Sequence, residues 1–132
     1  MMVAPLVVDS SVLIALILPA DGEDDHGGLD EALVDDRLDV LAPPLIDIEL
    51  INVAARRRQL DEPSLQRIVN RLEELAITRI DPELREIAHW ASRGLSAYDA
   101  TYAALAESTD AALLTQDRDF HFLLPQRATR RV

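Results

Sequence analysis

Short apolar runs rich in Val, Ile and Leu alternate along this chain with longer segments that have helical periodicity. Such runs predict strands buried on both faces, because a strand of that kind is apolar at successive positions. The expected strands are "APLVVDS" (4–10), "LDVLAP" (38–43), "AITRI" (76–80), "AALLTQD" (111–117) and "ATRRV" (128–132). Strands that alternate with helices favour an α/β fold. We therefore expect one domain spanning residues 1–132, a three-layer sandwich with a central, mostly parallel sheet of four to five strands flanked by helices.

Helices are expected between these strands, and several have clear start or stop signals. Ser10 is expected to cap the first helix, which Pro19 ends, and Asp61 to cap the fourth. The expected helices cover residues 11–18, 23–36, 44–60, 61–75, 81–94 and 95–108, with a short helical turn at 117–124. In a parallel α/β sheet, ligands bind outside the carboxyl ends of the strands. Functional side chains are therefore expected at that edge.

Four acidic residues that are far apart in the sequence are expected at this edge. Asp9 ends the first strand and Asp117 follows the fourth, while Glu49 and Asp99 lie near the starts of two helices. Carboxylates gathered in one small volume repel each other, by roughly 3 kcal/mol per pair at ~5 Å and an effective dielectric of ~20. A hard divalent cation removes this repulsion, since Mg²⁺ binds carboxylate oxygens and water. The sequence therefore predicts a Mg²⁺ site.

Each of these acids also has a purely structural interpretation. Asp9 can cap the first helix, and Glu49 can lie at the surface or pair with an arginine. Asp99 stands three residues after Ser96, so the two can form a variant of a capping box. Asp117 can be a turn residue. These interpretations do not exclude metal binding, because one Asp can cap a helix and coordinate a cation.

Charge is distributed unevenly along the chain. Residues 21–39 hold nine acids and one arginine, which gives −8 of the total net charge of −11 and leaves −3 for all other residues. The remaining arginines include two clusters, Arg56, Arg57 and Arg58, and Arg127, Arg130 and Arg131. A polarised molecule of this kind can bind a polyanion with its basic parts despite its acidic total.

Composition excludes several classes of function. The chain has no cysteine, so thiolate metal sites are excluded and a reducing cytoplasm is the natural setting. No apolar run reaches the roughly 20 residues that cross a membrane. All 13 basic residues are Arg. Without a lysine, a phosphorelay receiver or a haloacid-dehalogenase-type phosphatase is excluded. A Gly-rich loop for dinucleotides is also lacking.

Four sequence blocks, in this order, carry a resemblance to a known family. They are "VVDSSVLIALI", "PPLIDIELINVAARR", "LSAYDATYAALAE" and "LLTQDRDF". With these blocks the chain resembles PIN-domain ribonucleases, and in particular the VapC toxins of bacterial toxin–antitoxin pairs, over essentially its whole length. The resemblance implies a PIN-like fold.

The resemblance also implies roles for individual residues. The catalytic acids that match the family's pattern are Asp9, Glu49, Asp99 and Asp117, and the implied metal ligands are Asp9, Asp99 and Asp117, with Asp119 as an auxiliary position. Ser10 and Thr115 match small hydroxyl positions that can orient water or a ligand.

The implied activity is hydrolysis of RNA phosphodiesters by a Mg²⁺-dependent endoribonuclease, with Mn²⁺ as a substitute. Arg56, Arg57 and Arg58 are candidates to bind flanking phosphates, or alternatively form a solvated helix end. The implied partners are RNA, a second copy in a homodimer, and a VapB-like antitoxin that inserts a basic segment between the carboxylates. The alternative is a degenerate PIN domain that serves as a binding scaffold without nuclease activity.

The aromatic residues and histidines carry weaker signals. Tyr98 and Tyr102, four residues apart on one helix, can flank the groove and stack on bases, or can pack in the core. The histidines, His26, His89 and His121, lack the spacing of a zinc site and are expected to be structural or exposed.

Overall fold

In the described part of the chain, five parallel strands form one sheet in the order β3-β2-β1-β4-β5. The computed structural model describes residues 5–18, 39–116 and 129–131. The strands are β1 (Pro5–Val8), β2 (Asp39–Ala42), β3 (Ile77–Arg79), β4 (Ala112–Thr115) and β5 (Thr129–Arg131). Every expected strand is therefore confirmed, and the sheet is parallel throughout. The first strand lies at its centre, between β2 and β4.

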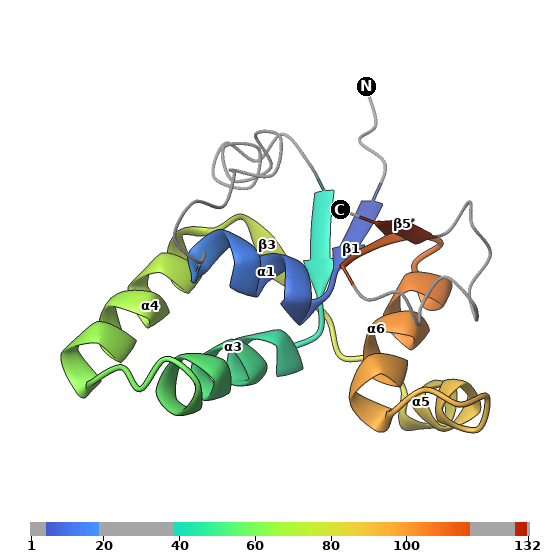
Figure 1. Cartoon of the computed structure of the whole chain (residues 1–132). Coiled ribbons are helices and arrows are strands. Elements are labelled where there is room, and N and C mark those ends of the chain that lie inside the picture. Colours follow the sequence, from blue (N-terminus) through green and yellow to red (C-terminus); the bar gives the residue numbers. More distant parts are fainter. Residues whose placement is uncertain (1–4, 19–38, 117–128, 132) are drawn as a thin grey trace.

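Helices cover both faces of this sheet. Within the described residues they are α1 (Ser10–Ile17), α3 (Leu45–Arg56), α4 (Glu62–Glu74), α5 (Leu84–Ala91) and α6 (Ala97–Ser108). Figure 1 shows α1, α3 and α4 in the left half of the view and α5 and α6 in the right half, with β1 and β2 between them. This division follows from right-handed crossovers, since the chain steps one way from β1 to β3 and returns from β3 to β4. The expected three-layer α/β sandwich is confirmed.

The carboxyl ends of the central strands lie at one edge of the sheet, and helices begin there. In Figure 1, β2 points down the page, α1 and α3 start close to its lower end, and α6 starts low and runs upward. The expected helix over 23–36 and the turn over 117–124 lie outside the described residues. The structure therefore places the starts of α1, α3 and α6 around the edge where the acidic residues are expected.

Several helix starts differ from the expectation, and α6 begins at Ala97, two residues later than expected. The cap of α1 is Asp9 rather than Ser10, because the Asp9 backbone is extended and its side chain accepts from the Val12 N–H. Helix α5 begins at Leu84, three residues later than expected. There the chain stays extended beyond β3, since the Ile80 N–H still donates to the Ala42 carbonyl at 3.0 Å. Asp61 caps α4 as expected.

The core lies between the sheet and its two helical layers. Val7, Val8 and Leu113 in the central strands are fully buried. Helix α6 presents the fully buried Ala100, Ala103 and other small residues to the sheet, so its backbone can approach the strands closely. Within residues 5–18 and 39–116, no helix is long and apolar enough to span a bilayer.

Candidate active site

Asp9 lies buried at the carboxyl end of the central strand. Its side chain is only 4% exposed. Oδ1 accepts from the Ser11 hydroxyl at 2.5 Å and from the Val12 N–H at 3.3 Å, and Oδ2 accepts from the Thr115 hydroxyl. Hydrogen bonds to the charged form compensate for the desolvation of a buried carboxylate. The structure therefore holds a carboxylate in a fixed orientation at this edge, with donors from both α1 and β4.

Ser11 also connects Asp9 to the end of β4. Its hydroxyl donates to Asp9 and accepts from the Gln116 N–H at 3.0 Å. Gln116 is the residue before Asp117. Because Asp117 and Asp119 both lie outside the described residues, their expected roles stay predictions.

Glu49 comes from the second turn of α3 and lies near Asp9. The Tyr102 hydroxyl donates to its Oε1, and the Ser10 hydroxyl is a second hydrogen-bond partner. Burial raises the pKa of Glu49 above its ordinary value, and the negative charge of Asp9 raises it further, while the two hydroxyls oppose that shift. The structure thus brings together Asp9, Glu49 and Ser10 from the start of α1 and from α3. The alternative that Glu49 pairs with an arginine is not observed among the described residues.

Asp99 occupies the first turn of α6. The Ser96 hydroxyl caps this helix by accepting from the Asp99 N–H at 3.0 Å. This bond is one half of the expected capping box, so that half is confirmed. The helix start also places the Asp99 carboxylate favourably for the helix dipole. Across residues 5–18 and 39–116, no group of three or more Asp, Glu or His residues is arranged to hold a metal ion. The convergence of four carboxylates therefore stays a prediction.

The arginine cluster at the end of α3 divides into two kinds of residue. Arg56, Arg57 and Arg58 are all exposed, and the positive charge of Arg56 in the last turn suits the helix dipole. The Arg58 guanidinium donates to the carbonyl of Leu18, the C-cap residue of α1. Arg58 is therefore a cap for another helix, a role that the sequence did not reveal. Phosphate binding by this cluster remains untested.

The two tyrosines of α6 have different environments. Tyr102 is 1% exposed, so the core alternative is correct for it, whereas Tyr98 is 63% exposed. The contact between Tyr102 and Glu49 was not anticipated. The spacing of three residues puts Tyr102 on the same helix face as Asp99, but it does not identify Glu49 as the partner.

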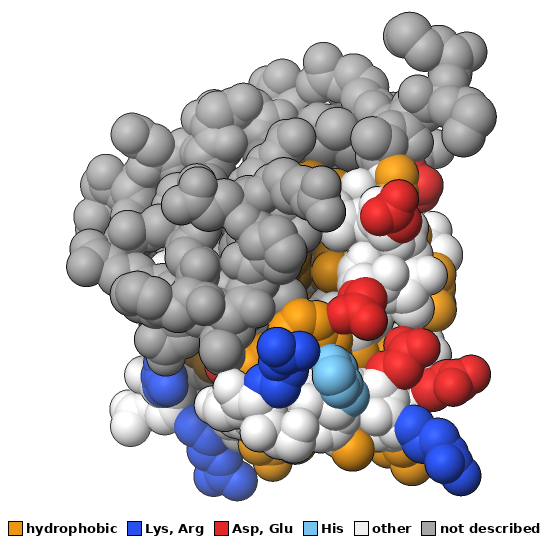
Figure 2. All heavy atoms as spheres, turned by 90° about the vertical axis from the view of Figure 1, so that its right-hand side faces the viewer, with side chains coloured by type: hydrophobic (Ala, Val, Ile, Leu, Met, Phe, Trp, Pro, Cys, Tyr) orange, Lys and Arg blue, Asp and Glu red, His pale blue; other side chains and the backbone are white. Residues whose placement is uncertain are grey.

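The face formed by α5 and α6 offers no continuous basic surface in its described part. Figure 2 shows Asp and Glu side chains spread down this face, with Arg side chains only in its lower half. His89 of α5 is exposed, as expected, whereas His26 and His121 lie outside the described residues.

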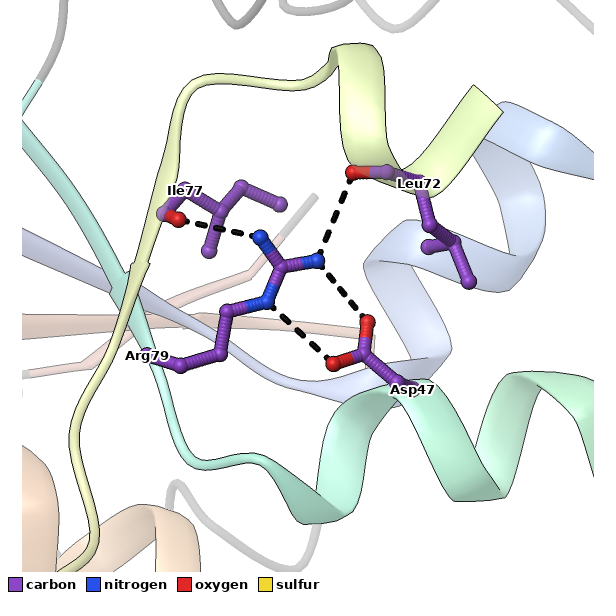
Figure 3. Close-up of polar contacts among 4 residues, drawn as sticks. All are labelled: Asp47, Leu72, Ile77 and Arg79. Carbon is purple, nitrogen blue, oxygen red and sulfur yellow. Dashed lines mark hydrogen bonds and ion pairs between the residues drawn. The ribbon is translucent and has the colours of Figure 1, made fainter. Parts of the chain in front are cut away.

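A partly buried ion pair connects α3 to β3. The Arg79 guanidinium binds Asp47 in a two-pronged arrangement, with N–O distances of 2.8 and 3.2 Å (Figure 3). It also donates to the carbonyls of Ile77 at 3.0 Å and Leu72 at 3.4 Å. Arg79 therefore ties together α3, β3 and the last turns of α4. Because Asp47 precedes Glu49 by two residues, this pair also fixes the turn that carries Glu49.

Replacement of Arg79 by Met is expected to destabilise the protein by about 2 kcal/mol, because Asp47 and two backbone carbonyls lose a charged donor. Chemical denaturation measures this change. The matched control is Glu74→Gln, which removes an exposed ion pair to Arg71 at 3.8 Å and should cost at most about 0.5 kcal/mol. Equal effects of the two substitutions would contradict the structural role of Arg79.

Fold and site together define an α/β domain with acidic side chains at the carboxyl edge of a parallel sheet. The family model described as "PIN domain" matches residues 6–122. The chain therefore belongs to the PIN-domain family.

Relatives and solved structures agree with this assignment. The chain is 34% identical over 116 residues to the VapC ribonuclease Mb0985 of Mycobacterium bovis and to ribonuclease VapC9 of Mycobacterium tuberculosis, with 85% of each chain covered. The crystal structure of PAE2754 from Pyrobaculum aerophilum matches with a TM-score of 0.72 and 25% identity, over 99% of this chain and 91% of that one. Mycobacterium tuberculosis VapC20, at 16% identity and a TM-score of 0.65 over 89% of this chain and 94% of that one, supports the fold.

Proposed function

We propose that this protein is a Mg²⁺-dependent endoribonuclease that acts as the toxin of a type II toxin–antitoxin pair. The observation that carries the proposal is the position of Asp9 and Glu49, two carboxylates that lie near each other at the carboxyl end of the central strand and are each held by side-chain hydroxyls. The relatives that are named as VapC ribonucleases support the same activity.

The residues at this edge fit a hard divalent cation, because the available ligands are carboxylate oxygens. We propose that Asp9, Asp99 and Asp117 hold Mg²⁺, or Mn²⁺ as its substitute, with Asp119 as a further ligand. When bound, such an ion lowers the pKa of water and stabilises negative charge on a phosphate. Thr115 orients Asp9 by its hydrogen bond to Oδ2.

Glu49 is proposed to orient the attacking water and to accept a proton from it. A carboxylate whose pKa is raised is a better proton acceptor near neutral pH than an ordinary one. The Ser10 hydroxyl, a hydrogen-bond partner of Glu49, helps to fix its direction. Arg56 and Arg57 are proposed to bind phosphates that flank the cleaved bond, since their side chains are exposed.

The proposed protein partners follow from the charge of the site. Clustered carboxylates attract cations, so an antitoxin of the VapB type can inhibit the enzyme by inserting an Arg or Lys between them. A second copy of the chain is proposed as a further partner, in a cytoplasmic homodimer. The alternative function is a PIN domain that binds proteins or metals without cleaving RNA.

RNA cleavage by the purified protein tests the proposal. We expect cleavage of end-labelled RNA in Mg²⁺ or Mn²⁺, no cleavage in chelator, and suppression when the product of a small neighbouring reading frame is bound. Cleavage that is unaffected by chelator would contradict the metal dependence. If the protein cleaves RNA but does not bind the protein encoded by the neighbouring reading frame, it would be a PIN nuclease that is not part of a toxin–antitoxin pair.

A further inference from the structure

The hydroxyl of Tyr102 is a polar atom in an otherwise apolar position. The side chain is 1% exposed and lies on the part of α6 that also buries Ala103 and Leu105. A phenylalanine would fill the same space without burying a hydroxyl, which is unfavourable unless the hydroxyl is hydrogen-bonded. Here the hydroxyl donates to Oε1 of Glu49, and Ser10 is a second partner.

This hydrogen bond connects two helices that belong to different layers. Glu49 is on α3, on the same side of the sheet as α1, and Tyr102 is on α6, on the other side (Figure 1). Contact between them therefore passes around the carboxyl end of β1, where Asp9 and Ser10 lie. The two residues are 53 positions apart in the sequence.

The two side chains differ in how freely they move. Glu has three rotatable bonds and a half-buried position, so its carboxylate has several orientations available. The Tyr102 ring has two rotatable bonds and is held by core packing. A rigid donor bonded to a mobile acceptor fixes the acceptor.

We propose that Tyr102 is a positioning residue that acts through Glu49. Its hydroxyl holds the Glu49 carboxylate from across the sheet edge in the direction that the cleavage reaction requires. The inference rests on the proposed nuclease function and extends it to a residue that does not contact substrate.

Tyr102→Phe removes only the hydroxyl oxygen and tests the inference. We expect the maximal rate of RNA cleavage to fall about tenfold or more, as for other residues that orient functional groups, with little change in KM. The matched control is Thr101→Val, one residue earlier on α6. Its hydroxyl donates to the Ala97 carbonyl within the same helix at 2.8 Å, and its loss should leave the rate near that of wild type.

A double-mutant cycle separates positioning from general damage. In a Glu49→Ala background, Tyr102→Phe should change the residual single-turnover rate by less than about twofold, because its target is already absent. A tenfold loss in both backgrounds would overturn the inference. Full activity of Tyr102→Phe in the wild-type background would overturn it too.

Thermal unfolding in chelator gives a second measurement that does not depend on activity. Tyr102→Phe should lower the Tm of the otherwise wild-type protein by a few degrees, because the Glu49 carboxylate loses a hydrogen bond. In the Glu49→Ala background it should not lower the Tm. A wild-type protein that cleaves no RNA would contradict the proposed function itself, whereas equal Tm losses in the two backgrounds would contradict the Tyr102–Glu49 contact.

Discussion

Induction of the wild-type protein in cells is expected to arrest their growth, and Asp9→Asn is expected to abolish this arrest. The same substitution should reduce RNA cleavage on the order of a hundredfold or more. The substitution removes the negative charge that a divalent cation needs, at an acid that is buried in the structure. The fold should survive, because Asn and Asp are equivalent helix caps and the Asn oxygen can still accept from the Val12 N–H. The Thr115 hydroxyl can rotate to accept from the new amide group.

The matched control for this substitution is Asp61→Asn. Asp61 is also a helix cap, since it accepts from the Ser64 N–H at 3.0 Å at the start of α4, and it is exposed. Asp61→Asn should leave toxicity and cleavage unchanged. Growth curves at matched expression, single-turnover cleavage and circular dichroism make the comparison. A folded Asp9→Asn protein with wild-type toxicity would favour the binding-scaffold alternative over a nuclease.

Glu49→Gln is expected to lower cleavage on the order of a hundredfold and to stabilise the metal-free protein at neutral pH. The loss of activity follows from the loss of a proton acceptor. The gain in stability follows from the raised pKa of Glu49, whose ionised form is penalised chiefly by burial and further by the charge of Asp9. Gln has no charge to bury and can still accept hydrogen bonds from Tyr102 and Ser10.

The stability gained by Glu49→Gln should depend on pH in a defined direction. The folded state holds the Glu49 proton more tightly than the unfolded state does, so the stability that Glu49 contributes is present below its ordinary pKa of 4.5 and is lost as the pH rises through the folded value. The Tm advantage of Glu49→Gln in chelator should therefore be small in acid and grow toward neutral pH. For the predicted loss of RNA cleavage, the control is Glu107→Gln, which changes an exposed glutamate and should leave cleavage unchanged. If Glu49→Gln were less stable than wild type at neutral pH, the hydrogen bonds to the carboxylate would outweigh its burial.

The strands were predictable because their signal is local. Runs such as residues 4–10 and 111–117 are short, apolar at consecutive positions and closed by polar residues, which is typical of strands buried on both faces. The place of Asp9 was predictable for the same reason, because it follows such a run directly. The sequence offers both Asp9 and Ser10 as the cap of α1, since both are good caps and one position separates them, and the structure selects Asp9.

The contacts that fix the site were not predictable from the sequence. Tyr102 bonds to Glu49 across 53 positions, and Arg79 binds Asp47 across 32. Such pairs depend on the angles and distances between helices and strands, which no local periodicity encodes. Arg58 illustrates the same limit, because an arginine at a helix end is compatible equally with phosphate binding and with its observed bond to the Leu18 carbonyl.

The central position of β1 has a consequence for the order in which the site is completed during synthesis. The first strand pairs with β2 on one side, but its other neighbour is β4, with Val8 opposite Leu114. Protein chains are made from the N-terminus, and pairings between distant segments form late. Asp9 therefore leaves the ribosome early but gains its hydrogen bond from Thr115 only after β4 has been made. The site proposed to cleave RNA is thus incomplete until β4 has been made and has paired with β1.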